Sequence, residues 1–116
     1  MTLSFGPAVP VLRCFDEARA RAFYCGLLGF SVDWAQRPAP DRPLYMQVSR
    51  GGFVLHLSEH DGDGRLAARL RIPVHGLDRL RDEMLAQGFP LDEPEEAAAV
   101  TLHDPFGNTL HFVEQD

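Results

Sequence analysis

The sequence predicts an α+β fold of two tandem βαβββ modules, and an internal repeat is the first observation that does so. Residues 54–59, Val-Leu-His-Leu-Ser-Glu, match residues 109–114, Thr-Leu-His-Phe-Val-Glu, 55 positions later. Residues 28–33, Leu-Gly-Phe-Ser-Val-Asp, likewise match residues 87–92, Gln-Gly-Phe-Pro-Leu-Asp, 59 positions later. A module of about fifty residues cannot bury an adequate core alone. We therefore expect one domain, 1–116, in which His56 and His111 occupy related positions.

The first module, about residues 5–60, is predicted to form a strand, a helix and three further strands. Alternating residues 8–14 indicate the first strand, and Asp16 is placed to cap the helix. Gly29 can end that helix in the left-handed conformation. The apolar stripe of the helix consists of Ala20, Phe23, Tyr24, Leu27 and Leu28. The later strands are expected over residues 30–34, 44–49 and 53–58, the last two joined across Arg50-Gly51-Gly52.

A polar linker, residues 60–66, leads into the second module, about residues 67–116, which repeats the same order. A strand is expected over residues 69–74, and a helix over residues 77–87 ends at Gly88. The helix is expected to bury Leu77, Leu80, Met84 and Leu85. The remaining strands are predicted over residues 89–92, 100–103 and 109–114, with a loop over 94–98 and a Pro-Phe-Gly-Asn turn over 104–108.

Composition limits the classes of partner. A net charge of −6 argues against nucleic acid, since phosphate binding needs a basic surface. No apolar run approaches the roughly 20 residues of a membrane helix, and no basic segment precedes the N-terminal apolar residues as in a signal peptide. Cys14 and Cys25 form no disulfide framework, and we expect inert thiols. A cytoplasmic protein that contacts neither membrane nor nucleic acid is expected.

Two motifs, in the doubled order of elements, carry a resemblance. They are Phe-Tyr-x-x-Leu-Leu-Gly-Phe at residues 23–30 and Asp-Pro-Phe-Gly-Asn at residues 104–108. With them the chain resembles the vicinal oxygen chelate superfamily, which includes glyoxalase I, extradiol dioxygenases and bleomycin-resistance proteins. The resemblance covers nearly the whole chain. It implies paired βαβββ modules that form a curved mixed sheet around a cavity, helices on the outer face, and a homodimer.

The resemblance also implies four positions at which superfamily enzymes hold a metal ion. In this chain they fall at Val9, His56, Arg69 (to within about one residue) and His111. Val9 has no donor atom and Arg69 would repel a cation, whereas a catalytic site generally uses three protein ligands or more. We therefore expect no metal cofactor. The alternative is a metal-dependent lyase or dioxygenase in which His56 and His111 hold a divalent metal such as Zn, Ni or Fe.

Without a metal, the chain is most similar to bleomycin-resistance proteins, which implies a dimer that sequesters a small organic ligand and performs no chemistry. Alternation places His56 and His111 on the strand face opposite their apolar neighbours. Arg69 shares its face with Arg71, and aromatic side chains suit planar ligands. The candidate ligand-binding residues are Trp34, Tyr45, Gln47, His56, Arg69, Thr101 and His111.

Structural alternatives stay open for these residues. Both histidines could simply bond neighbouring groups, Trp34 could pack at a dimer interface, and Arg69 with Arg71 could lie at an exposed strand end. Residues 56–60 also spell His-x-x-Glu-His, a zinc-peptidase string that requires both histidines on one helix face. No helix fits between Gly51-Gly52 and the glycines at 62 and 64, so we expect this match to be coincidental.

Overall fold

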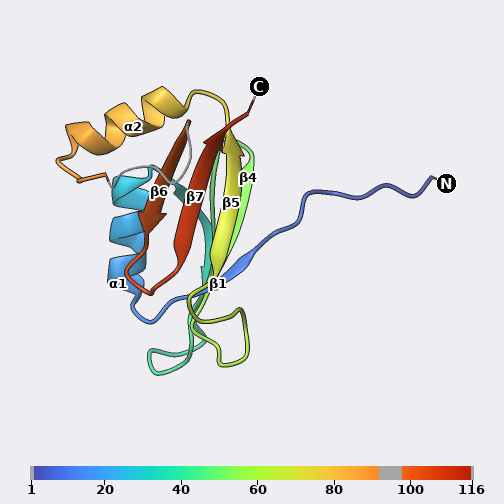
Figure 1. Ribbon diagram of the computed structural model, residues 1–116. Coiled ribbons are helices and arrows are strands. Elements are labelled where there is room, and N and C mark those ends of the chain that lie inside the picture. The colour runs from blue at the N-terminus through green and yellow to red at the C-terminus, as the bar shows by residue number, and fades with distance from the viewer. Residues whose placement is uncertain (1, 92–97, 116) are drawn as a thin grey trace.

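The computed structural model describes residues 2–91 and 98–115, and its strands form two mixed sheets (Figure 1). The first sheet has the order β1-β4-β3-β2, with β1 parallel to β4 and the other pairs antiparallel. The second has the order β5-β7-β6, with β5 parallel to β7. The strands are β1 (Val11–Arg13), β2 (Ser31–Gln36), β3 (Tyr45–Arg50), β4 (Phe53–Ser58), β5 (Arg69–Val74), β6 (Ala99–His103) and β7 (Thr109–Glu114). The predicted α+β class of two related modules is confirmed.

The strand pairing repeats between the modules. In each, the first strand runs parallel to the last strand, so Val11 lies opposite His56 and Arg71 lies opposite His111. Inward-facing residues of β3 and β4 are fully buried, among them Met46, Leu55 and Leu57. The repeat in sequence thus corresponds to a repeat in structure.

The first helical segment begins where the sequence predicts. The Asp16 carboxylate accepts a hydrogen bond from the Arg19 amide at 2.9 Å and caps α1 (Glu17–Ala20). The helix continues with wider, π-type turns in η1 (Arg21–Leu27), which the apolar spacing does not distinguish from α turns. Gly29, at φ +73°, ends the segment as expected.

The second helix, α2 (Leu77–Ala86), differs from expectation at one residue and at its end. Leu77 and Met84 are buried, but Leu85 is 55% exposed because it lies about 100° further round the helix than Met84. After the helix, Gly88 at φ +73° lets the Phe89 amide donate to the Met84 carbonyl at 3.0 Å. No described helix is long and apolar enough to span a bilayer.

The turn after α2 takes the place of the beginning of the strand predicted over residues 89–92. Residues 89–91 form no strand, because the chain turns back against the end of α2 there. Asp92 and most of the predicted 94–98 loop, with Glu95 and Glu96, lie outside the described residues, so the described part of the second module has three strands.

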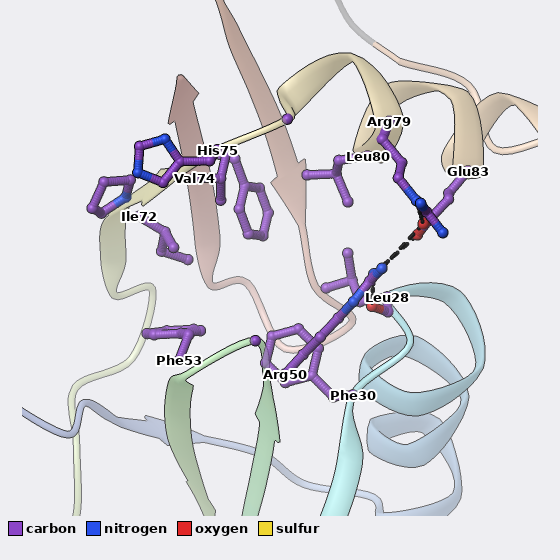
Figure 2. Close-up of a pocket in the computed structure, with 14 residues that line it drawn as sticks. Leu28, Phe30, Arg50, Phe53, Ile72, Val74, His75, Arg79, Leu80 and Glu83 are labelled. Atoms are coloured by element: carbon purple, nitrogen blue, oxygen red, sulfur yellow. Dashed lines mark hydrogen bonds and ion pairs between the residues drawn. The ribbon is translucent and has the colours of Figure 1, made fainter. Parts of the chain in front are cut away.

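Charged contacts join the tip of the first module to α2 (Figure 2). Arg50, at the end of β3, donates to both carboxylate oxygens of Glu83 at 2.9 and 3.0 Å. The same guanidinium donates to the Leu28 carbonyl at 2.8 Å, and Gln87 donates to the Leu27 carbonyl at 2.9 Å. The two modules are therefore joined at their surface by side chains whose roles the sequence does not indicate.

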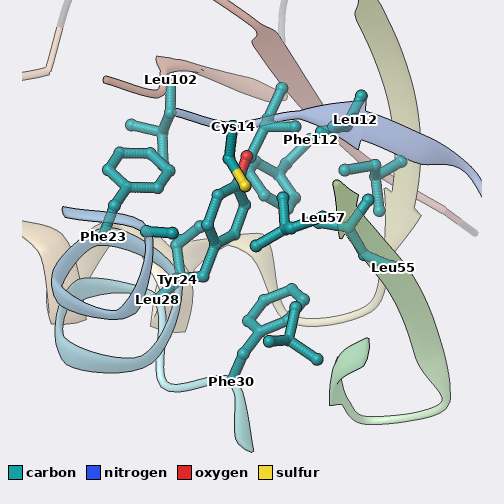
Figure 3. Packing of buried hydrophobic residues seen from close by; sticks show 14 of the residues in the cluster. Leu12, Cys14, Phe23, Tyr24, Leu28, Phe30, Leu55, Leu57, Leu102 and Phe112 are labelled. Carbon is teal, nitrogen blue, oxygen red and sulfur yellow. The ribbon is translucent and has the colours of Figure 1, made fainter. Parts of the chain in front are cut away.

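The hydrophobic core is shared by both modules (Figure 3). Both helical segments lie on the same side of the strands, and Tyr24 of η1 stands among side chains from each sheet (Figures 1 and 3). Leu57 of β4 and Phe112 of β7 belong to the same buried cluster. Burial raises the pKa of the Cys14 thiol to about 12, so this cysteine is almost entirely unionised near neutral pH.

A buried carboxylate links the core to the turn before β7. Asp104 accepts hydrogen bonds from the Phe106 and Asn108 amides through Oδ1, each at 2.8 Å. Its Oδ2 accepts from the Tyr24 hydroxyl at 2.6 Å and from Asn108 Nδ2 at 2.8 Å. Asn108 Nδ2 also donates to the Arg13 carbonyl at 3.0 Å. One side chain of the second module thereby satisfies polar groups from both modules.

Removing the Tyr24 hydroxyl should destabilise the fold. In Tyr24→Phe the Asp104 carboxylate loses one donor in a buried site, and a hydrogen bond to a charged group contributes about 1.5–3 kcal/mol. Urea unfolding followed by circular dichroism should show a free energy of unfolding lower by about that amount.

Tyr45→Phe is the matched control, because it removes the same atom from a half-buried tyrosine whose partner is an imidazole rather than a carboxylate. Its cost should be about 0.5–1.5 kcal/mol. If the two variants lose equal stability, Asp104 does not have the structural role described.

Candidate functional site

Four of the predicted binding residues meet on one face of the first sheet: Trp34, Tyr45, Gln47 and His56. Gln47 lies opposite both His56 in β4 and Trp34 in β2. Leu55 and Leu57 point into the core, so the pleat turns His56 to the other face of the sheet. We call this set, together with Asp33 below, the β-face cluster.

Hydrogen bonds hold the His56 ring in place at both nitrogens. Nδ1 lies 2.7 Å from the Tyr45 hydroxyl and Nε2 lies 2.9 Å from Gln47 Oε1. The amide of Gln47 is itself oriented, because its Nε2 donates to the Asp33 carboxylate at 3.0 Å. Its oxygen must then face His56, so Nε2 of the ring carries a proton, and in the neutral form of the ring Nδ1 accepts from Tyr45.

Asp33 is the member of the cluster that sequence analysis missed. Strict alternation would place Asp33 and Trp34 on opposite faces, but the register between β2 and β3 shifts between Val32 and Trp34. The bulge allows both side chains to reach the same face. Hydrogen bonds from Gln47 and Ser49 lower the pKa of Asp33, which keeps this carboxylate ionised near neutral pH.

Aromatic rings form the outer surface of the cluster. Trp34 stacks on Tyr45 with ring centres 5.9 Å apart and planes 10° from parallel, and it contacts His56 edge-on at 5.3 Å. Trp34 remains 38% exposed. His60, in the linker, lies edge-on to Tyr45 at 6.2 Å. The cluster therefore offers a planar apolar surface beside a fixed set of hydrogen-bonding groups.

The other three predicted residues lie on the second sheet. Thr101 Oγ1 is 2.7 Å from His111 Nδ1, and His111 is only 2% exposed. Arg69 and Arg71 are exposed on β5, but the residue paired with His111 is Arg71, whereas Arg69 pairs with Thr109. The predicted residues thus form two groups, one on each sheet, and the β5 position beside His111 belongs to Arg71.

The donor set does not suit a divalent cation. Both ring nitrogens of His56 are engaged by Tyr45 and Gln47, and the neighbour of His56 in β1 is Val11, which has no donor atom. In the second module the equivalent neighbour of His111 is a guanidinium. Within residues 2–91 and 98–115 no three side chains of His, Cys, Asp or Glu gather as a metal site would require.

The His-x-x-Glu-His string has no peptidase geometry. Its first residues belong to strand β4, and the chain then enters turns rather than a helix. Glu59 accepts from the Leu44 amide at 2.9 Å and pairs with Arg37 at 3.0 Å. This glutamate therefore holds the loop before β3 in place. The expectation that the string is coincidental is confirmed.

Comparisons with known proteins agree on one family. A family model described as glyoxalase superfamily protein matches residues 1–116. A search of curated proteins found no match. Among solved structures, the bleomycin-binding protein of bleomycin-producing Streptomyces verticillus, complexed with copper(II)-bleomycin, is 27% identical to this chain. It covers 99% of this chain and 100% of its own, with a TM-score of 0.71.

Two further structures show how widely the fold is shared. TnmS3, an antibiotic binding protein from Streptomyces sp. CB03234, is 20% identical with a TM-score of 0.70, over 100% of this chain and 99% of its own. Glyoxalase I of Leishmania major, an enzyme, is 21% identical with a TM-score of 0.70, over 96% of this chain and 87% of its own. The fold therefore occurs in both binding proteins and enzymes.

The hydrogen bonds around His56 predict one ring tautomer. In alkaline solution, where imidazole is neutral, ¹⁵N-detected NMR should show the proton of His56 on Nε2. Gln47→Leu removes the acceptor that holds this proton and should allow a mixture of tautomers. Gln115→Leu, at an exposed position after β7, makes the same substitution away from the ring and is the control. A single Nδ1–H tautomer in the wild type would contradict the network.

Proposed function

This chain belongs to the glyoxalase superfamily, and on that premise we propose that it sequesters a small, partly aromatic organic molecule, as a homodimer and without a metal cofactor. The observation that supports this proposal best is the β-face cluster. It combines an exposed aromatic stack, Trp34 on Tyr45, with His56, Gln47 and Asp33 held in fixed orientations. Planar rings bury area and stack there, while the polar groups select orientation.

The same hydrogen bonds argue for binding rather than turnover. A general base or a metal ligand needs a free ring nitrogen directed at the substrate or ion, and both nitrogens of His56 are directed at protein groups. A rigid, satisfied network lowers the ordering cost of binding a ligand of matching shape. Antibiotic-binding proteins with this fold are consistent with such a role.

A homodimer would cover apolar surface that the single chain leaves exposed. The N-terminal residues extend away from the sheets (Figure 1), with Leu3 largely exposed and Phe5 89% exposed. Phe15 and Leu66 are further large exposed apolar residues. A second copy that packs on these side chains would also bring a second sheet near the β-face cluster. We therefore propose that the complete binding site lies between two subunits.

Replacing Trp34 should weaken ligand binding. Titration of metal-free bleomycin and of doxorubicin, a planar aromatic antibiotic, into dialysed protein should reveal binding of at least one by calorimetry. Trp34→Ala removes the stacking surface and should lower the affinity about tenfold or more, since about 1.4 kcal/mol corresponds to a factor of ten.

The control is Leu85→Ala, which removes an exposed apolar side chain from α2 and should leave the affinity unchanged. Metal content of the protein, measured by mass spectrometry after purification without added metal, is the second measurement. Stoichiometric Zn, Ni or Fe, or binding that is unchanged in Trp34→Ala, would overturn the proposal.

The proposed dimer is held together in part by the exposed N-terminal residues, such as Phe5. Light scattering after size-exclusion chromatography should give twice the chain mass. Phe5→Ser should weaken the dimer by about tenfold or more, because burying a phenylalanine contributes about 1.5–3 kcal/mol. Leu85→Ser is the matched control. A wild-type protein that is monomeric at high micromolar concentration would contradict the dimer and leave the β-face cluster as the entire site.

A further inference from the structure

A cavity of about 350 Å³ opens at the seam between the modules (Figure 2), and its lining residues do not belong to the β-face cluster. Its walls come from the hairpin between β3 and β4, the end of β5 and the first turns of α2. Phe53, Ile72 and Phe112 line it, and alternation places these residues on the core faces of their strands. His56 and His111 are on the opposite faces. The cavity is therefore separate from the site proposed above.

The interior of this cavity is apolar and partly aromatic. Phe30 and Phe53 meet edge-to-face with ring centres 6.0 Å apart, and Leu28, Val74 and Leu80 complete the wall. A volume of this size is at the lower end of the range of about 300–1,000 Å³ that small-molecule sites occupy. An apolar body of one ring and a short chain is the kind of group that such walls favour.

The mouth of the cavity carries an excess of positive charge. Arg50 and Arg79 both bond to Glu83, so two guanidiniums share one carboxylate. The Arg79 side chain is 84% exposed and reaches Glu83 only through Nε, at 3.3 Å. His75 also lines this edge. In a protein with a net charge of −6, this local excess is unusual and favours an anionic group.

The positive end of α2 does not add to that charge. The amides of Gly76 and Leu77 already donate to the Glu114 carboxylate at 3.1 and 3.0 Å. These bonds lower the pKa of Glu114 and keep it ionised, so the helix terminus and Glu114 largely offset each other. Attraction of an anion at the mouth must therefore come from the arginine side chains.

We propose that this seam cavity binds a small amphipathic carboxylate, with the apolar body between Phe30, Phe53 and Leu80 and the carboxylate at Arg79 and Arg50. The guanidiniums can bond a second carboxylate beside Glu83 without breaking the link between the modules. Because the occupant would touch the hairpin, β5 and α2 together, binding would also stabilise the contact between the two modules.

The probe is 4-phenylbutyrate, titrated into ¹⁵N-labelled protein and followed by the amide signals of Gly51 and Gly76, which both line the cavity. The Trp34 indole signal reports separately on the β-face cluster. We expect saturable shifts of both glycine amides at millimolar concentration or below, with little change at Trp34. The neutral amide 4-phenylbutyramide should bind about fivefold more weakly or worse.

Arg79→Gln should weaken 4-phenylbutyrate about threefold and leave the amide unaffected, because it removes one exposed charge. Arg19→Gln makes the same charge change at an exposed position of α1 and is the control. Val74→Phe should fill part of the cavity and weaken both compounds. Its amide spectrum shows directly whether the variant remains folded.

Equal affinity for the acid and the amide would overturn the inference. So would the absence of a saturable shift at Gly51 and Gly76 up to about 10 mM, which is about ten times the dissociation constant of a millimolar site. Shifts at Trp34 alone would do the same. The variant Trp34→Ala separates this proposal from the function proposed above. It should weaken sequestration about tenfold or more while the glycine shifts with 4-phenylbutyrate persist.

Discussion

The buried carboxylate of Asp104 is the interaction on which the rest of the structure depends. It accepts hydrogen bonds from the amides of its own turn, the side chain of Asn108 and the hydroxyl of Tyr24. Asn108 in turn donates to the backbone carbonyl of Arg13 in β1. A carboxylate is stable in a core only when its oxygens are fully hydrogen-bonded. The helical segment of the first module therefore packs against the turn before β7 in the second module. This contact explains why the Asp-Pro-Phe-Gly-Asn motif and the Phe-Tyr motif occur together.

The two faces of each sheet carry different kinds of side chain. One face of each sheet packs under the helices in a single core, and the opposite face carries the predicted binding residues. On the first sheet that face carries the β-face cluster, in which a bulge in β2 adds Asp33 to residues already aligned by register. On the second sheet, Thr101 and His111 are more deeply buried, so the two modules are related in fold but not in surface chemistry.

His56 and His111, two of the positions that the resemblance implies for a metal ion, have hydrogen-bonding side chains and a guanidinium as neighbours. His56 bonds to Tyr45 and Gln47, and the strand beside His111 contributes Arg71. A fold shared by antibiotic-binding proteins and an enzyme does not decide between those activities. The decision depends on which side chains the site presents, and the proposal of ligand retention rests on those of the β-face cluster.

The sequence by itself determined most elements and the face on which most strand side chains lie. Strands β4, β5 and β7, the Asp16 cap and the helix ends at Gly29 and Gly88 follow from alternation, capping and glycine conformation, which are local properties. Only the tertiary structure decided that Asp33 joins the cluster and that Arg71 rather than Arg69 lies beside His111, because bulges and parallel register depend on pairing between distant strands. The seam cavity likewise depends on tertiary structure, because its walls come from both modules, with Arg50 from one and Glu83 from the other.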